Sequence, residues 1–258
     1  MTYAQPHEVR YDVHGERGER TETERVPGVD VIAAFDFDGT LTKGGSVWKW
    51  LSSLVGRTVV AQAGAALAPS LARAAVVGGD AADAAKEALF VRTLAGLDAG
   101  EVAARGVAFG QRHYHRHSRN QVRARVDWHR RQGHVLVLVS ASPELYVAPV
   151  GEELGFDGVL ATRLEVDPAG RLTGRFDGRN CRGSEKLRRL DEWLDDLWSG
   201  TPTHSSTRNE RPFLWAYGNS AGDRQLLAAA DIGVDAGRLG RLGSLRRYRR
   251  LGDVLTAW

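Results

Sequence analysis

Short apolar runs alternate with stretches of helical periodicity along most of this chain. The runs have the length of buried parallel strands. They lie at 31–37, 134–139, 158–162, 213–217 and 232–234. Because strands that alternate with helices form parallel sheets, the pattern predicts an α/β fold built on a doubly wound parallel sheet.

The region between the first two predicted strands is helical throughout. It is rich in alanine, which favours helix. Its clearest helices are predicted at 81–93, 99–108 and 121–132. Asp80 and Asp98 are the predicted N-caps of the first two, and Glu101 would complete a capping box with Asp98. Gly133 is predicted to end the third helix.

This helical block divides the chain. Since it interrupts a pattern of strands, 46–132 is predicted to be an inserted all-helical cap, with 31–45 and 133–258 forming the core domain. The two glycines at 44–45 form a candidate hinge. Residues 1–30 are polar, mix glutamate with arginine, and are predicted to be a loose N-terminal arm.

The second half of the chain supplies the remaining elements. A helix is predicted over 143–154, and the alternation at 163–175 predicts a β-hairpin that turns at 167–170. Ser184 is the predicted N-cap of a helix over 185–198, whose leucines form one apolar stripe.

The composition of the 258 residues is that of an ordinary soluble protein, with 42% apolar and 26% charged residues. The single cysteine, Cys181, excludes an intramolecular disulfide and suits a reducing cytoplasm, so a cytoplasmic location is predicted. The polar start is not a signal peptide. The alanine-rich stretch at 59–77 contains Gln62, Pro69 and Arg73, and no integral membrane segment is predicted there.

The net charge of +3 and the pI of about 9.2 raise the question of an anionic partner. Acidic and basic residues interleave through most of the chain, and no recognised nucleic-acid motif appears, so no nucleic-acid partner is predicted. The tail at 238–250 is rich in arginine. A solvated basic tail is the simpler interpretation of it, and contact with a lipid phosphate at a membrane surface is the other.

Two aspartates end the first predicted strand. On an extended chain Asp36 and Asp38 point the same way, toward the sheet edge where ligands bind. Gly39 frees backbone N–H groups to face an anion. Two close carboxylates repel each other unless a cation or proton lies between them, and Mg²⁺ with substrate phosphate oxygens suits such a pair. One aspartate could then attack phosphorus while the other transfers protons. A strand end followed by an Asp-Gly turn is the alternative.

Two further residues are candidates for the same edge. Ser140 follows the second predicted strand, so its hydroxyl should lie near Asp36, although a serine there could also cap a helix or form a turn. Lys186 lies in the first turn of its predicted helix, where a cation opposes the helix dipole. This suggests that it faces an anion, with Arg182 as the alternative cation and a solvated lysine as the structural alternative.

Together these segments resemble the motifs of the haloacid dehalogenase-like (HAD) superfamily. The resemblance covers about 31–234 and rests on four runs, at 36–42, 140–147, 179–186 and 218–223. It implies a HAD-like Rossmannoid core. It also implies that Asp36 is the nucleophile that forms an aspartyl-phosphate, and that Asp38 protonates the leaving oxygen and later activates water. Ser140 and Lys186 would hold the phosphoryl group.

The resemblance further implies a Mg²⁺ site. Its ligands would be Asp36, the backbone carbonyl of Asp38, and the residues at the positions of Asn219 and Asp223. The superfamily usually has an acid at the position of Asn219. An amide oxygen can bind Mg²⁺ but carries no charge, so weaker metal affinity is expected, and Asp223 could compensate directly or through water.

The place of the cap and the run at 141–147 resemble the phosphoserine-phosphatase-like branch, the subfamily IB hydrolases. Phosphoserine phosphatases carry a glutamate nine residues after the nucleophile, and this chain has Gly45 there, followed by Ser46. The resemblance therefore implies a small phosphorylated substrate, with phosphoserine disfavoured. Phosphorylated lipid head groups and other small phosphomonoesters remain in the substrate class.

The leading hypothesis is a Mg²⁺-dependent phosphomonoester hydrolase. One alternative is a non-catalytic or weakly active protein that binds a phosphorylated ligand, which Asn219 suggests, and another is a phosphotransferase. No transition-metal site is predicted at His113, His115 and His117, because alternate residues of a helix do not converge.

Overall fold

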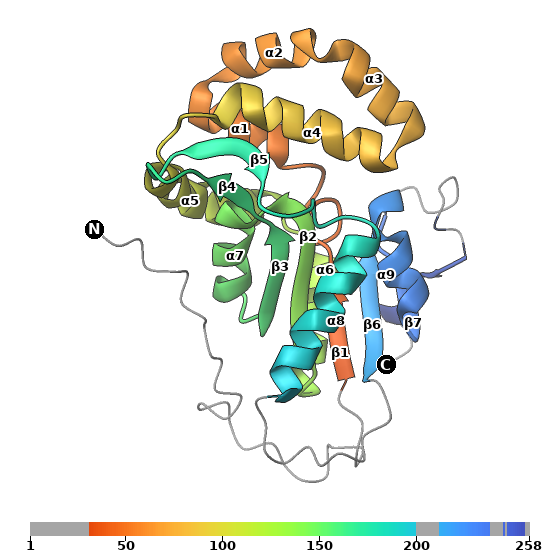
Figure 1. Ribbon diagram of the computed structural model, residues 1–258. Coiled ribbons are helices and arrows are strands. Elements are labelled where there is room, and N and C mark those ends of the chain that lie inside the picture. The colour runs from red at the N-terminus through yellow and green to blue at the C-terminus, as the bar shows by residue number, and fades with distance from the viewer. Residues whose placement is uncertain (1–30, 200–211, 238–244, 246, 256–258) are drawn as a thin grey trace.

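The computed structural model describes residues 31–199, 212–237, 245 and 247–255 (Figure 1). In this part of the chain, helices cover both faces of a parallel sheet, and a further group of helices lies over one edge of it. The predicted N-terminal arm and most of the predicted arginine-rich tail lie outside the described residues.

Six strands of the described chain form the parallel sheet, in the order β3-β2-β1-β6-β7-β8. The central strand is β1, where Ala34 lies opposite Val137 on one side and Ala216 on the other. The predicted α/β class with a doubly wound parallel sheet is confirmed. The strands are β1 (Val31–Phe35), β2 (Val135–Pro143), β3 (Gly158–Thr162), β6 (Phe213–Gly218), β7 (Ile232–Asp235) and β8 (Arg249–Arg250).

Side chains of β1 alternate between two buried layers. Ala33 and Phe35 pack on the side of α6, α7 and α10, and Ile32 and Ala34 pack on the side of α8 and α9. Because both faces are covered, β1 is apolar at every position. The helices of the two layers are α6 (Asn120–Arg131), α7 (Glu144–Glu153), α8 (Ser184–Ser199), α9 (Arg224–Ala229) and α10 (Leu251–Leu255).

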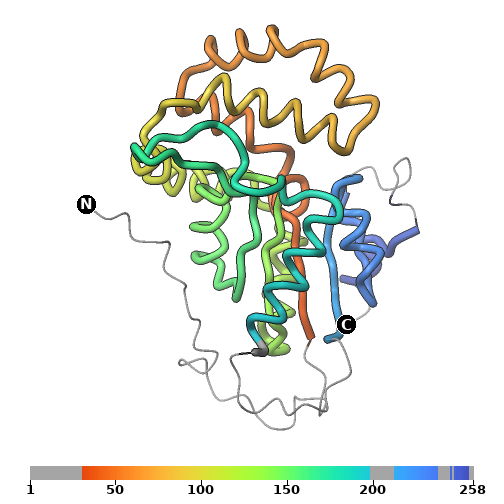
Figure 2. Tube along the Cα trace, in the orientation of Figure 1, coloured from red at the N-terminus to blue at the C-terminus, as the bar shows by residue number. Residues whose placement is uncertain are grey.

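A separate group of helices lies over the carboxyl edge of the sheet, as the Cα trace in Figure 2 also shows. It consists of α1 (Val47–Val55), α2 (Arg57–Ala66), α3 (Ala68–Val77) and α4 (Gly79–Leu94). Helix α5 (Ala99–His117) packs against both α1 and α7, and so connects this group to the core. The predicted division into cap and core at 46 and 132 stays a prediction.

The predicted hairpin is confirmed as β4 (Leu164–Val166) and β5 (Leu172–Phe176). It follows β3 in the chain but packs against α4. At Gly174, where φ is +79°, a Cβ atom would lie 2.5 Å from the Cα of Val91, so only glycine allows this approach. A β-hairpin from the second half of the chain therefore packs with the helices that lie over the sheet edge.

Helices α2 and α3 lie farthest from the sheet (Figure 1). α3 has no buried residue, and Val76 at its end is 88% exposed. None of the described helices alone has the length and hydropathy to cross a membrane; α2 and α3 reach both only as a pair bent by 71°. Helix α3 therefore contributes little to the core, whereas α2 buries Val60 and Ala63.

The structure corrects several predicted boundaries. The prediction that Asp80 caps a helix is wrong, because α4 begins at Gly79 and Asp80 lies in its first turn. Helix α8 begins at Ser184 rather than after it. The first strand ends at Phe35, since the chain then turns. The Asp98 cap is confirmed, with its side chain accepting a hydrogen bond from the Glu101 N–H at 2.9 Å.

Candidate active site

Strand ends bring several predicted site residues to one edge of the sheet. Because β2, β1 and β6 are parallel neighbours, residues at their carboxyl ends lie side by side. Asp36 follows β1, Ser140 lies near the end of β2, and Asn219 follows β6. A cavity of about 260 Å³ opens here. Its lining includes Asp36, Asp38, Ser140, Ser142, Lys186 and Asp223.

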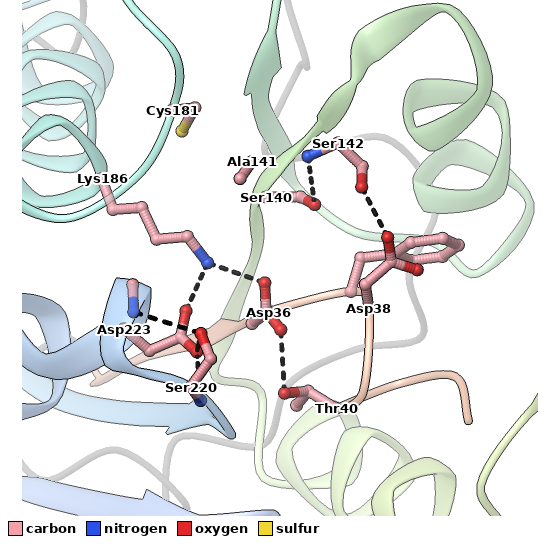
Figure 3. Close-up of polar contacts among 12 residues, drawn as sticks. Asp36, Asp38, Thr40, Ser140, Ala141, Ser142, Cys181, Lys186, Ser220 and Asp223 are labelled. Carbon is pink, nitrogen blue, oxygen red and sulfur yellow. Dashed lines mark hydrogen bonds and ion pairs between the residues drawn. The ribbon is translucent and has the colours of Figure 1, made fainter. Parts of the chain in front are cut away.

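Lys186 joins two carboxylates beside this cavity (Figure 3). Its Nζ lies 2.7 Å from Asp36 Oδ1 and 2.6 Å from Asp223 Oδ1. The lysine side chain is 1% exposed and comes from the first turn of α8, where the helix dipole disfavours a cation. The two carboxylates compensate the buried charge. The anions that Lys186 contacts in this structure therefore belong to the protein itself.

The site favours the charged forms of these three groups to different extents. Burial and then the negative charge of Asp223 raise the pKa of Asp36 to about 7, against the attraction of Lys186. Burial also opposes the charges of Lys186 and Asp223, but attraction between opposite charges outweighs it. The pKa of Lys186 is therefore raised and the pKa of Asp223 is lowered. Asp36 carries the least stabilised charge, so a further cation beside it would favour its nucleophilic form.

Asp223 also shapes the loop after β6. Its Oδ2 accepts hydrogen bonds from Ser220 Oγ at 2.9 Å and from the N–H groups of Asn219 at 3.0 Å and Ser220 at 2.9 Å. A Cβ atom on Gly218 would lie 2.4 Å from that of Asp223. Since donors engage both carboxylate oxygens, these contacts hold the loop and Lys186 in place. The predicted role of Asp223 as a metal ligand stays a prediction.

The turn after β1 packs against Asn219. Gly39 has a φ of +84°, and a Cβ atom there would lie 2.1 Å from Asn219 Nδ2, so the position requires glycine. Thr40 Oγ1 donates to Asp36 Oδ2 at 3.0 Å. These contacts fix the nucleophile candidate relative to the loop after β6. The predicted contact of Gly39 with a substrate phosphate stays a prediction.

Predicted metal ligands meet around the amide of Asn219. One terminal atom of the Asn219 amide lies 2.9 Å from the backbone oxygen of Asp38 and 3.0 Å from Asp36 Oδ2. If this atom is the amide oxygen, three acceptors face one another, as they do around a cation. Oxygens bound to octahedral Mg²⁺ at 2.0–2.1 Å are about 2.9 Å apart. The two oxygen–oxygen separations that involve the Asn219 amide therefore fit Mg²⁺.

Besides the Asp36 carboxylate, a cation at this position would depend on a backbone oxygen and an amide. Within the residues that the structure describes, no group of three or more His, Cys, Asp or Glu side chains could hold a metal ion. If the Asn219 amide is turned over, its nitrogen donates to Asp36 Oδ2 and to the Asp38 backbone oxygen instead. The same geometry thus suits either a bound cation or a hydrogen bond that replaces it.

Asp38 directs its carboxyl group toward Ser142 (Figure 3). Its Oδ2 accepts hydrogen bonds from Ser142 Oγ at 2.7 Å and from Ser46 Oγ at 2.6 Å. Its Oδ1 is buried and has no partner among the described residues. Nearby, Ser140 Oγ accepts a hydrogen bond from the Ser142 N–H at 3.0 Å, which leaves the proton of the Ser140 hydroxyl for another acceptor.

The outer wall of the cavity contains residues that the sequence analysis missed. Lys86 of α4 donates to the Ala141 carbonyl and, at 2.8 Å, to Asn180 Oδ1. Asn180 Nδ2 in turn donates to Asp83 Oδ1 at 2.7 Å. Burial lowers the pKa of Lys86 to about 8. Asp83 and Lys86 are three residues apart, and this spacing indicates a shared polar face but identifies no partner.

Other features of interest lie apart from this site. A cavity of about 380 Å³ lies against α9 and β7 and carries none of the predicted site residues. The rings of His113 and His117 stack at 4.5 Å, while His115 Nε2 lies 2.9 Å from Glu153 Oε1.

The chain is similar to several known proteins. A family model described as haloacid dehalogenase-like hydrolase matches residues 33–228. Protein CicA from Caulobacter vibrioides is 40% identical over 102 residues, which are 40% of this chain and 40% of that protein. A histidinol-phosphatase from Neisseria meningitidis serogroup C is 27% identical over 95 residues, which are 34% of this chain and 43% of that protein. The chain thus matches less than half the length of these curated relatives.

Solved structures share the fold. A Bordetella pertussis Tohama I protein of unknown function aligns with a TM-score of 0.67 and 22% identity, over 86% of this chain and 98% of that one. A phosphoserine phosphatase, solved as a phospho-aspartyl intermediate analogue, aligns with a TM-score of 0.59 and 18% identity, over 88% of this chain and 98% of that one. At these identities the likeness concerns the fold alone.

Proposed function

The chain belongs to the haloacid dehalogenase-like hydrolase family, and on this basis we propose that it is a Mg²⁺-dependent phosphomonoester hydrolase that acts through an aspartyl-phosphate. The observation that carries the proposal is the position of Asp36. Its carboxylate lies against Lys186 on one side and Asn219 on the other, at the wall of a polar cavity. A carboxylate held in this way is a suitable nucleophile for phosphorus.

In the first step of the proposed reaction, Asp36 attacks the phosphorus atom. A bond forms between phosphorus and an Asp36 oxygen as the ester P–O bond breaks, and Asp38 gives a proton to the leaving oxygen. In the second step, water attacks the same phosphorus, Asp38 takes the proton of that water, and Asp36 leaves as a free carboxylate. The sum of the two steps is hydrolysis of the ester.

The remaining side chains bind and orient the phosphoryl group. Lys186 uses two of its three N–H donors on carboxylates, so the third is available for a phosphoryl oxygen. The Ser140 hydroxyl can donate to another. Mg²⁺, held by Asp36, the Asp38 backbone oxygen and Asn219, would neutralise charge on the phosphoryl oxygens.

The substrate that fits this cavity is small and polar. A volume of about 260 Å³ leaves no room inside for a lipid chain, although the head group of a lipid phosphate could still enter. Histidinol phosphate is a candidate because one relative is named a histidinol-phosphatase. Phosphoserine is disfavoured, since Gly45 offers no carboxylate for an amino group.

Release of phosphate from p-nitrophenyl phosphate, with and without Mg²⁺, tests the proposal directly. We expect turnover that requires Mg²⁺ and that Asp36→Asn abolishes. Equal release by the unsubstituted protein and by Asp36→Asn would overturn it. The same assay over histidinol phosphate, phosphoserine, phospho-sugars, nucleotides and lipid phosphates identifies the substrate, and added alcohols reveal transfer to acceptors other than water.

Asn219 favours a second candidate, a protein that binds a phosphorylated ligand without turnover. An amide nitrogen that donates to Asp36 and Asp38 would take the place of the cation. Asn219→Asp separates the two candidates. For a hydrolase, a second carboxylate ligand should lower the Mg²⁺ concentration for half-maximal activity about tenfold. Ligand-dependent thermal stabilisation without turnover in either protein would favour the binding function.

A further inference from the structure

The two oxygens of the Asp38 carboxyl group are in different environments. Oδ2 accepts three hydrogen bonds, from the Ser46 hydroxyl at 2.6 Å, the Ser46 N–H at 3.1 Å and the Ser142 hydroxyl at 2.7 Å. Oδ1 is buried without a partner among the described residues. The hydrogen bonds that hold the carboxyl group therefore all act on one of its two oxygens.

Ser46 does not use its hydroxyl for the helix that it begins. It lies at the N-cap of α1, where a serine normally accepts a hydrogen bond from the first turn. Its backbone is helical, with φ −103° and ψ −28°, and its side chain makes no capping hydrogen bond. The hydroxyl points instead to Asp38, and Ser46 is fully buried. Helix capping therefore does not account for this side chain.

The hydrogen bond from Ser46 to Asp38 determines the direction of a second one, between Ser46 and Tyr146. Its hydroxyl lies 2.7 Å from Ser46 Oγ, and the ring is fully buried. Ser46 has one hydroxyl proton, which it donates to Asp38, so it must accept the proton of Tyr146. The chain of donors thus runs from Tyr146 to Ser46 and ends on Asp38 Oδ2.

We infer that Ser46, Tyr146 and Ser142 are positioning residues that fix the orientation of the Asp38 carboxyl group in the proposed reaction. The inference rests on the proposed function and adds residues to it. With Oδ2 held by three donors, rotation of the carboxyl group is restrained, and Asp38 keeps one orientation beside the cavity that it lines. Protonation of the leaving oxygen depends on that orientation.

The inference predicts losses that depend on the leaving group. 2,4-Dinitrophenolate leaves without a proton, whereas phenolate is a poorer leaving group that benefits from one. Ser46→Ala should lower kcat/KM for phenyl phosphate about 10- to 100-fold, as part of a general-acid contribution of about 10²- to 10⁴-fold. It should lower kcat/KM for 2,4-dinitrophenyl phosphate less than about threefold. Tyr146→Phe should show the same selectivity with a smaller loss.

Ser52→Ala is the matched control. Ser52 lies in the same helix, and its hydroxyl donates to the Trp48 carbonyl at an exposed position, so this change should affect both substrates equally and little. Melting temperatures show whether each variant is folded, and Ser142→Ala replaces any variant that is not.

The outcomes separate the inference from the proposed function. Equal losses for the two substrates in Ser46→Ala and Tyr146→Phe, or losses no larger than in Ser52→Ala, overturn the inference while hydrolysis itself stands. An unsubstituted protein that hydrolyses neither substrate overturns the proposed function and the inference with it. A loss confined to phenyl phosphate supports both.

Discussion

Two buried polar clusters lie beside the neighbouring strands β1 and β6, and one of them borders a cavity. The carboxylate–lysine cluster consists of Asp36, Lys186 and Asp223. Its cation is matched by carboxylates 2.6 and 2.7 Å away, and all three side chains line the cavity at the sheet edge. It therefore combines buried charge with access for a small molecule.

The arginine–histidine cluster consists of Arg125, His129, His134 and Tyr217. Arg125 is 2% exposed and lies over the ring of Trp128, 4.0 Å from its centre. Among the described residues it has no carboxylate partner, and its Nη2 has no hydrogen bond. The two cavities identified beside the described residues do not border this cluster.

The difference between the clusters follows from two neighbouring positions at the end of β1. The ring of Phe35 stacks on Tyr217 at 4.3 Å, while the next residue, Asp36, meets Lys186. Consecutive residues of an extended chain face opposite sides. Burial of polar groups is therefore common to a packed interior and to the candidate active site, and access from a cavity distinguishes the candidate site.

The largest expected effect comes from Lys186→Met. It leaves Asp36 and Asp223 as adjacent buried carboxylates, so the free energy of unfolding should fall by about 3–5 kcal/mol. kcat/KM for p-nitrophenyl phosphate should fall at least about 100-fold, because a donor to the phosphoryl group is lost. Urea unfolding and initial rates measure the two effects.

Lys43→Met is the control for this change. Lys43 is exposed in the loop between β1 and α1, and its loss should change stability by less than about 0.5 kcal/mol. Comparable rate losses in the two variants would show that Lys186 has no special role. A stable but inactive Lys186→Met would indicate that the two carboxylates share a proton when the lysine is absent.

Tyr217→Phe should instead change stability alone. The Tyr217 hydroxyl accepts a hydrogen bond from Arg125 Nε at 3.1 Å and lies 2.8 Å from His129 Nε2. Without it both buried groups lose a partner, so the free energy of unfolding should fall by about 2–4 kcal/mol. kcat/KM should stay within about twofold. Tyr248→Phe, which removes an exposed hydroxyl, should change neither quantity measurably.

A rate loss in Tyr217→Phe that exceeds the loss in Tyr248→Phe by tenfold would break the distinction between the two clusters. It would mean that the arginine–histidine cluster contributes to the position of the loop after β6, which begins immediately after Tyr217 and Gly218.

The sequence predicts the carboxylate–lysine cluster better than its surroundings. Strand ends in a parallel sheet converge, so the pattern alone places Asp36 beside Ser140. Ser46 and Tyr146 are different, because their contact joins positions 100 residues apart. The local sequence at Ser46 is typical of a helix cap, and the local sequence at Tyr146 is typical of an apolar helix face. Their contact, through which Ser46 connects Tyr146 to Asp38, depends on packing that local patterns do not encode.

The arginine–histidine cluster is equally hidden in the sequence. Arg125 and Arg123 belong to the same arginine-rich helix, yet Arg125 is buried and Arg123 is exposed. Their surroundings in the sequence are alike, and the direction in which α6 faces the sheet decides between them. Hydrophobic periodicity predicts that a helix forms here, but the orientation of each arginine follows from tertiary packing.

The smallest expected effect is the dependence of stability on pH. Burial, with smaller effects of the His134 and Arg125 charges, lowers the pKa of His129 to about 2. In the unfolded chain a histidine takes up a proton near pH 6.5, which the folded protein resists. The stabilisation is therefore complete above that pH and is lost as the pH falls. For His129 alone, the free energy of unfolding should drop by about 1 kcal/mol between pH 6.5 and 5.5.

Urea unfolding at pH 7.5, 6.5 and 5.5 measures this drop, and His129→Phe should reduce it by about one proton's contribution. The variant loses hydrogen bonds to Tyr217 and His134 at every pH, so the slope against pH, and not the stability at one pH, carries the information. An unchanged slope would mean that His129 is protonated in the folded protein. The arginine–histidine cluster would then hold two cations, and its difference from the carboxylate–lysine cluster would be one of charge balance as well as access.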